Sequence, residues 1–197
     1  MIEVIINGIN YRLNEETKTA EVIEKDGYEG DIIIPETVVL NEAIYRVTGI
    51  EDYAFDFCKN LKSITIPDSV NIIGESAFCG CKLLTAITIS NSVKSIGYGT
   101  FKYCDSLKSI TIPHGVTTIG EVVFEDCKNL ESITIPDSIE SIGREAFYCC
   151  KSLKAIYYEG TKAQWKKITL ANDTFKAWSR RSAINVVHCT DGDVWIY

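Results

Sequence analysis

A repeat of fixed length constrains this chain more than any other feature of its sequence. Segments that begin at Leu61, Leu84, Leu107, Leu130 and Leu153 share one pattern, and each begins 23 residues after the previous one. A unit of this size cannot bury both of its faces alone, so copies must stack to form a continuous core. The sequence therefore predicts an elongated stack of repeats.

Each unit opens with a short β-branched stretch, such as residues 63–66. Side chains alternate along a strand, so the isoleucines point one way and the serines and threonines the other. Proline at positions 67, 113 and 136 ends the strand because it has no N–H to donate. Stacking then predicts parallel strands centred on one isoleucine column. That column contains Ile64, Ile87, Ile110, Ile133 and Ile156.

The later part of each unit predicts a short helix. Between Ile73 and Cys81 the apolar residues lie at i, i+4, i+5 and i+8, which is one face of about two helical turns. We expect a helix or helical turn around each member of a phenylalanine column. This column contains Phe55, Phe78, Phe101, Phe124 and Phe147.

The repeat Leu-x-x-Ile-x-Ile-Pro-x-Ser-Val-x-x-Ile-Gly-x-x-Ala-Phe-x-x-Cys-x-x-Leu resembles the BspA-type, or Treponema-type, bacterial leucine-rich repeat. It departs from that pattern at Ser90, Thr100 and Val123. The resemblance implies an α/β fold, a leucine-rich-repeat solenoid. Its parallel sheet would lie on the concave face and its short helices on the convex face, with β-rich caps at both ends.

The pattern divides the chain into three regions. Residues 1–30 are expected to form an N-terminal β cap, residues 31–159 the repeats, and residues 160–197 a C-terminal cap. The first unit carries about nine extra residues between Val38 and Val47, which predict a protruding loop or small hairpin.

Both caps carry local signals of their own. Asn7-Gly8 and Asp191-Gly192 are hairpin turns between strand-forming segments. Residues 161–164 read as a capping box that opens a short helix through Ile168. Such atypical ends are expected because a bare sheet edge would recruit other chains.

Five of the eight cysteines occupy one column of the repeat. Stacked side chains run parallel to one another, which suits small buried hydrophobic groups better than disulfides. The spacings at Cys79 and Cys149 lack the paired pattern and histidines of a zinc site, so we expect neither metal nor cofactor. The column contains Cys58, Cys81, Cys104, Cys127 and Cys150.

Nucleophilic catalysis is not expected. The chain has two histidines: His114 stands in the column that elsewhere holds turn residues, and His188 lies beside Cys189. Adjacency in sequence does not make a Cys/His dyad in space. We therefore expect no catalytic residues and no enzyme activity.

The solvent side of the predicted sheet is small, uncharged and rich in hydroxyl groups. Threonine suits an exposed strand, which is sufficient to explain the pattern. The alternative is that a concave face of low relief lets a peptide or glycan lie close to the sheet. The candidate ligand-binding residues are Ser63, Thr65, Thr88, Ser109, Thr111, Ser132, Thr134 and Tyr157.

Aromatic residues concentrate near the C-terminal end. They are expected to form the core of the cap, whereas an exposed rim of Tyr or Trp would be an anchor for a partner. The set contains Tyr157, Tyr158, Trp165, Phe175, Trp178 and Trp195.

The formal net charge of −7 makes nucleic acid a poor partner. No apolar run is long enough for membrane insertion, and no secretory signal is visible at the start. We expect a monomer or weak oligomer. The resemblance implies a cell-surface or secreted recognition module that binds protein or glycan ligands in adhesion or host interaction. The alternative, favoured by the missing leader, is a structural or intracellular scaffold.

Overall fold

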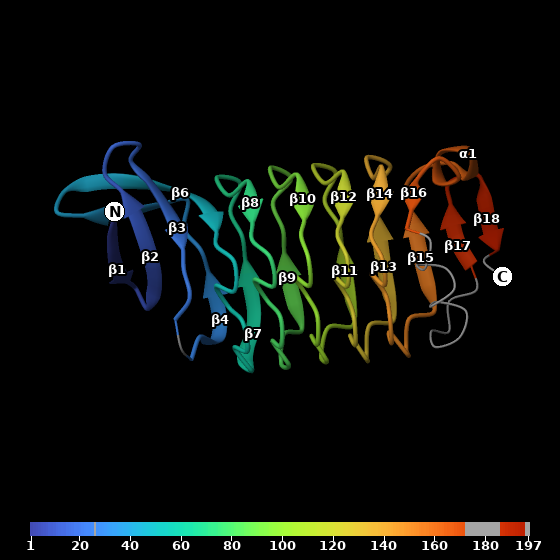
Figure 1. Ribbon diagram of the computed structural model, residues 1–197, viewed down its shortest axis with the longest axis horizontal. Coiled ribbons are helices and arrows are strands. Elements are labelled where there is room, and N and C mark those ends of the chain that lie inside the picture. Colours follow the sequence, from blue (N-terminus) through green and yellow to red (C-terminus); the bar gives the residue numbers. More distant parts are fainter. Residues whose placement is uncertain (26, 172–185, 196–197) are drawn as a thin grey trace.

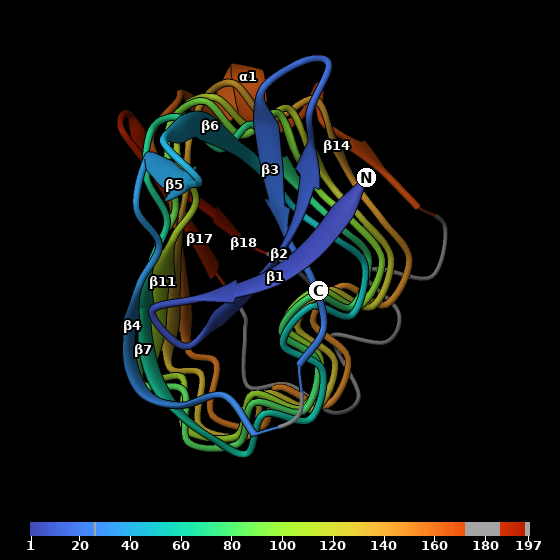
Figure 2. The ribbon, with the colours of Figure 1, turned by 90° about the vertical axis from the view of Figure 1, so that its left-hand side faces the viewer.

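The computed structural model describes residues 1–25, 27–171 and 186–195. Within them the chain winds into rungs that are stacked along the long axis of the molecule (Figure 1). In a view along the stack the rungs overlap, because each follows nearly the same path (Figure 2).

One side of the stack carries the long-strand ladder, which contains the five predicted parallel strands together with β4, β17 and β18. Ser109, Ser132 and Ala155 pair in register across three rungs, as the 23-residue repeat requires. Within the described residues the ladder is interrupted between β9 and β11, which do not pair. The strands are β4 (Glu29–Ile33), β7 (Asn60–Thr65), β9 (Ala86–Thr88), β11 (Ser109–Thr111), β13 (Ser132–Ile135), β15 (Ala155–Tyr158), β17 (Val186–Cys189) and β18 (Gly192–Trp195).

A second, short-strand ladder was not predicted. It contains β8 (Ile72–Ile73), β10 (Ser95–Ile96), β12 (Thr118–Ile119), β14 (Ser141–Ile142) and β16 (Thr169–Leu170). The last four pair in parallel order, while β8 pairs with β6 (Ala43–Ile50). The first four short strands each bury one apolar residue, such as Ile73 or Ile96, and Leu170 of β16 is partly buried. A segment of two residues is too short for alternation to reveal it in the sequence.

The prediction of short helices on the convex side is wrong. Each phenylalanine lies in a turn arm, a run of successive turns at residues 52–57, 75–80, 98–103, 121–126 and 144–149. Two residues per arm have a positive φ, for example Ser76 at 52° and Gly80 at 70°, whereas an α-helix needs about −63° throughout. The backbone N–H of Phe78 instead donates to the carbonyl of Thr100 in the next rung, at 3.0 Å.

The core is a stack of equivalent side chains. The five phenylalanines of the column are fully buried, and their rings are stacked with centroids 5.2 to 5.6 Å apart. Tyr28 continues the row towards the N-terminal cap, 4.6 Å from Phe55. The repeat therefore places one aromatic ring above another along the length of the molecule.

The prediction that the cysteines of the repeat column are buried thiols is confirmed. The thiol of Cys104 donates to the carbonyl of Phe78 in the preceding rung, at 3.2 Å, and the same bond recurs along the column. Burial raises the pKa of the Cys104 and Cys150 thiols well above the ordinary value. Burial also raises the pKa of Cys79 to about 12.

The N-terminal segment forms the predicted hairpin. β1 (Ile2–Ile6) pairs antiparallel with β2 (Ile9–Asn14) around Asn7 and Gly8, and β3 (Thr19–Val22) joins β2 to β6. The insertion in the first unit is also a hairpin, in which β5 (Thr37–Leu40) pairs with β6.

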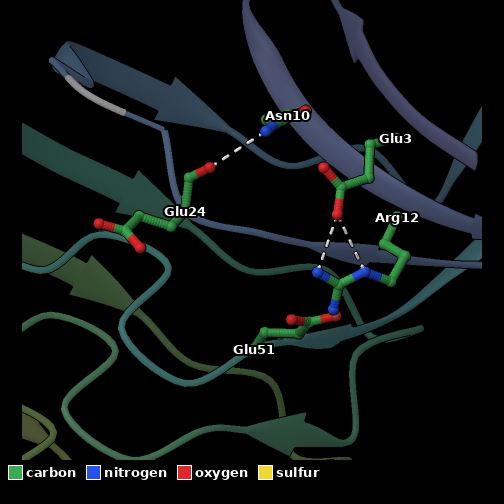
Figure 3. Close-up of polar contacts among 5 residues, drawn as sticks. All are labelled: Glu3, Asn10, Arg12, Glu24 and Glu51. Atoms are coloured by element: carbon green, nitrogen blue, oxygen red, sulfur yellow. Dashed lines mark hydrogen bonds and ion pairs between the residues drawn. The ribbon is translucent and has the colours of Figure 1, made fainter.

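A guanidinium group ties this hairpin to the first rung (Figure 3). Arg12 on β2 contacts Glu3 on β1 at 2.9 Å and also pairs with Glu51, which follows β6. The side chain of Asn10 donates to the carbonyl of Glu24 at 3.0 Å. Polar contacts therefore connect the cap to the stack on its solvent side, while the buried faces of β2 and β3 continue the core.

The C-terminal segment contains the predicted capping box. The Thr161 hydroxyl accepts from the Gln164 backbone, and the Gln164 side chain accepts from the Thr161 backbone. The helix that follows, α1 (Lys162–Trp165), ends earlier than the predicted Ile168. β17 and β18 then form a hairpin that extends the long-strand ladder beyond β15.

Removal of one ring from the stack should destabilise the whole repeat region. Phe101→Ala leaves a cavity between Phe78 and Phe124, and we expect it to lower the free energy of unfolding by about 3–5 kcal/mol in urea denaturation. Tyr98→Ala, at an exposed position on the same turn arm, should change it by about 0.5 kcal/mol or less. A cost below about 1.5 kcal/mol for Phe101→Ala would contradict the stacked core.

The thiols of the column should be unreactive in the folded protein. We expect the disulfide-forming reagent DTNB to modify the half-buried Cys189 first and the column cysteines only after unfolding. Unfolding without a reductant should then release all eight thiols. Recovery of fewer than eight would show that disulfides are present.

The same thiols should make the protein less stable in alkali. Thiols of the unfolded chain ionise at about pH 8.5, whereas those of the folded chain keep their protons because their pKa is raised. The free energy of unfolding should therefore fall as the pH rises above about 8.5. Cys104→Ala should reduce that slope by about 1.4 kcal/mol per pH unit and leave the slope below pH ~8 unchanged. Equal slopes above pH ~9 would contradict this account.

Candidate interaction surface

The outward side of the long-strand ladder, here called the sheet face, presents two rows of side chains. Strand register and the repeat period place equivalent residues of successive rungs beside one another. The first row contains Asp31, Ser63, Ala86, Ser109, Ser132, Ala155, Val186 and Trp195. The second row contains Ile33, Thr65, Thr88, Thr111, Thr134, Tyr157, His188 and Asp193.

The structure brings all eight predicted ligand-binding residues to this one face. Five are exposed, namely Thr65, Thr88, Ser109, Thr111 and Tyr157. The other three, Ser63, Ser132 and Thr134, are half-buried. Ser63 donates to Asp31 at 2.6 Å, so its hydroxyl is already engaged. Their shared position follows from the structure, whereas their role in binding stays a prediction.

A groove crosses the middle of the sheet face. It encloses about 500 Å³ and runs over β9 and β11, the two neighbouring strands that do not pair. Thr88, Ser109 and Thr111 line its floor, and His114 and Glu159 line one side. The surface is therefore hollowed where the ladder is interrupted.

Both borders of the sheet face carry charged side chains. On the border after the strands, His114 lies 3.6 Å from Asp137 and 3.3 Å from Glu159, and all three side chains are exposed. On the border before the strands, exposed lysines stand in every second rung, at Lys62, Lys108 and Lys154, with Thr85 and the exposed Glu131 at the positions between them. Between Ser63 and Tyr157 the two rows are uncharged, and Asp31 and Asp193 stand at their two ends.

Aromatic and acidic groups close the C-terminal end of the sheet face. The ring of Tyr157 stacks on that of His188, with centroids 5.2 Å apart and planes at 24°. The Nδ1 atom of His188 lies 2.9 Å from a carboxylate oxygen of Asp193, which fixes the imidazole in place. Trp195, 58% exposed, stands on the same face of β18. We call Tyr157, His188, Asp193 and Trp195 the aromatic corner.

The aromatic corner was only partly visible in the sequence. Tyr158 and Trp165 are buried and contact each other, as expected of a cap core, but Tyr157 and Trp195 are exposed. Phe175 and Trp178 lie outside the described residues. The one signal in the sequence was Tyr157, which stands in a repeat column that otherwise contains threonine. Tyr157 and His188 are far apart in the sequence and meet only where β15 pairs with β17. No local sequence pattern therefore predicts their contact.

No catalytic arrangement was found among the described residues. His188 points to the opposite side of β17 from its neighbour Cys189, so the two do not form a dyad. Within residues 1–25, 27–171 and 186–195, no group of three His, Cys, Asp or Glu side chains is placed to hold a metal ion. The helix present in those ranges is too short to cross a membrane.

Comparison with known families agrees with the ladder geometry. The BspA type leucine-rich repeat region matches residues 47–176 in six copies. The chain belongs to this repeat family. Leucine-rich repeats of this type are in general binding modules without catalytic activity. Comparison with curated proteins gave no match.

Solved structures of bacterial leucine-rich repeat proteins share the fold. A leucine-rich repeat protein of T. pallidum is 27% identical, with a TM-score of 0.70 over 79% of this chain and 71% of that chain. A leucine-rich cell surface protein of Faecalibacterium prausnitzii is 34% identical, with a TM-score of 0.77 over 85% of this chain and 42% of that chain. The BspA-type chain described here thus spans less than half of the second protein.

Proposed function

We propose that this BspA-type chain is a non-catalytic recognition module that binds a protein or glycan ligand on its sheet face. The repeats of residues 31–159 would carry the surface, with residues 1–30 and 160–197 as caps. The supporting observation is the uncharged row of exposed hydroxyl groups, which has charged side chains on both borders and exposed aromatic rings at one end. An exposed strand needs none of these borders for its stability.

The floor of the sheet face favours close approach of a ligand. Its side chains are short, so a chain that lies across the strands can reach several hydroxyl groups at once. Threonine and serine hydroxyls both donate and accept, which suits amide and sugar groups alike. Curvature of the stack, with the sheet on its concave side, would increase the contact area and is part of the proposal.

A role in adhesion or host interaction is the setting we propose for this binding. The support is the similarity to the leucine-rich cell surface protein of F. prausnitzii. The proposal can be tested by immobilising the intact chain and probing it with a glycan array and with solubilised surface proteins of host epithelial cells. Recovery of no specific ligand from either source would count against it.

One charge at the centre of the sheet face should block the ligand. Thr111→Lys should keep the free energy of unfolding within about 0.5 kcal/mol, because the side chain is exposed. A ligand on this face would have to desolvate the new ammonium group, so its dissociation constant should rise tenfold or more, equivalent to about 1.4 kcal/mol. Surface plasmon resonance with the recovered ligand measures the change.

The matched control introduces the same charge elsewhere. Glu121→Lys places a lysine at an exposed position of a turn arm, away from the sheet face, and should leave the affinity within about twofold. If Glu121→Lys abolishes binding and Thr111→Lys does not, the ligand is bound by the turn arms and the proposed surface is wrong.

A further inference from the structure

We infer that the aromatic corner is a stacking site for a pyranose ring of an uncharged glycan. This inference rests on the proposed function and narrows its ligand to one chemical class. It requires three features together: an exposed aromatic ring held in a fixed orientation, hydroxyl groups beside its free face, and a nearby carboxylate. The described structure supplies all three on neighbouring strands.

The ring of Tyr157 is held from one side. His188 stacks on the face that points toward β17, and Asp193 fixes the imidazole through a 2.9 Å hydrogen bond. Because side chains of paired strands stand side by side, the opposite face of the tyrosine ring looks toward β13. The neighbour on that side is the shorter Thr134, and Tyr157 as a whole is 47% exposed. Tyr157 therefore forms a rigid wall at the end of the hydroxyl row.

The surroundings of the free face match a sugar ring. A pyranose has an apolar face of C–H groups, which packs against the electron-rich face of an aromatic ring, and an edge of hydroxyl groups. Thr134 stands on the strand next to Tyr157, and Thr111 on the strand beyond it. The groove over β9 and β11 begins at Thr111, so further sugar units have a continuous path away from the wall.

Charge and hydrogen bonding also favour an uncharged glycan. Between Ser63 and Tyr157 the two rows contain no basic group that would pair with a uronic acid or a sulfate, and the exposed lysines lie on the border before the strands. Carboxylates in and beside the corner, including Asp193 and Glu159, are strong acceptors for sugar hydroxyls. An anionic ligand would meet repulsion from them.

Packing of the cap alone does not require this arrangement. At the equivalent positions of three preceding rungs the chain has Thr88, Thr111 and Thr134, and those rungs form the same strands. Tyr157 instead exposes an aromatic ring where a threonine satisfies the fold, and Trp195 exposes a second ring on the same face. Exposed rings also occur singly on the turn arms, as at Tyr98, so we assign to a ligand the grouping of two exposed rings on one sheet face and not exposure alone.

The experiment uses the full chain and three uncharged oligosaccharides, namely cellotetraose, maltotetraose and chitotetraose. Isothermal titration calorimetry measures their affinity, and saturation-transfer NMR identifies the sugar protons in contact. We expect binding of at least one oligosaccharide at concentrations below about 10 mM. Tyr157→Thr, which restores the residue of the repeat column, should weaken that binding tenfold or more, while Tyr157→Phe should keep it within about threefold because the ring face remains.

Tyr98→Thr is the matched control, because Tyr98 is also 47% exposed but lies on a turn arm. It should leave the affinity unchanged, and circular dichroism should show that all three variants are folded. Absence of binding by all three oligosaccharides, or equal binding by the wild type and Tyr157→Thr, overturns the inference. If the chain captures a protein ligand that Thr111→Lys releases, and binds no oligosaccharide, the proposed function stands and the glycan inference fails.

Discussion

Backbone hydrogen bonds between successive rungs determine how the side chains of this molecule are aligned. In the turn arms an N–H donates to a carbonyl 22 residues further along, as from Phe78 to Thr100 and from Phe101 to Val123. These bonds hold equivalent residues one above another, and the aromatic and cysteine columns follow from that alignment. They also continue past the interruption between β9 and β11, so the stack stays joined where the long-strand ladder does not.

The same bonds explain why the arms are not helical. One position of the arm has a positive φ in every rung, and it is occupied by Tyr53, Ser76, Gly99, Val122 and Glu145. One of these five is a glycine, so the residue type does not choose the conformation. A left-handed conformation costs other residues about 1–2 kcal/mol, which the bonds between rungs offset. The spacing of buried residues resembled a helix, but it reflects successive turns, and no local preference distinguishes the two.

Sequence reasoning therefore succeeded where a feature depends on the repeat or on a local signal. The period predicted the parallel strands through Ile64 and its equivalents, and Asn7-Gly8 predicted the first hairpin. Sequence reasoning failed for the short-strand ladder, because a strand of two residues is too short to show an alternating pattern in the sequence. For the candidate site it placed the hydroxyl rows correctly. The neighbour of Tyr157 could not be predicted, because His188 reaches it only through the fold of the cap.

The rungs have a further consequence for the length of the sheet face. Each rung pairs only with its neighbours, so a duplicated 23-residue unit could enter the stack without altering either cap. Every added unit would move the aromatic corner about 4.8 Å further from Asp31, which is the spacing of adjacent strands. The number of units thus determines the distance between the two ends of the sheet face. Gain or loss of units during evolution would change how long a ligand the surface accommodates while the chemistry at its ends is kept.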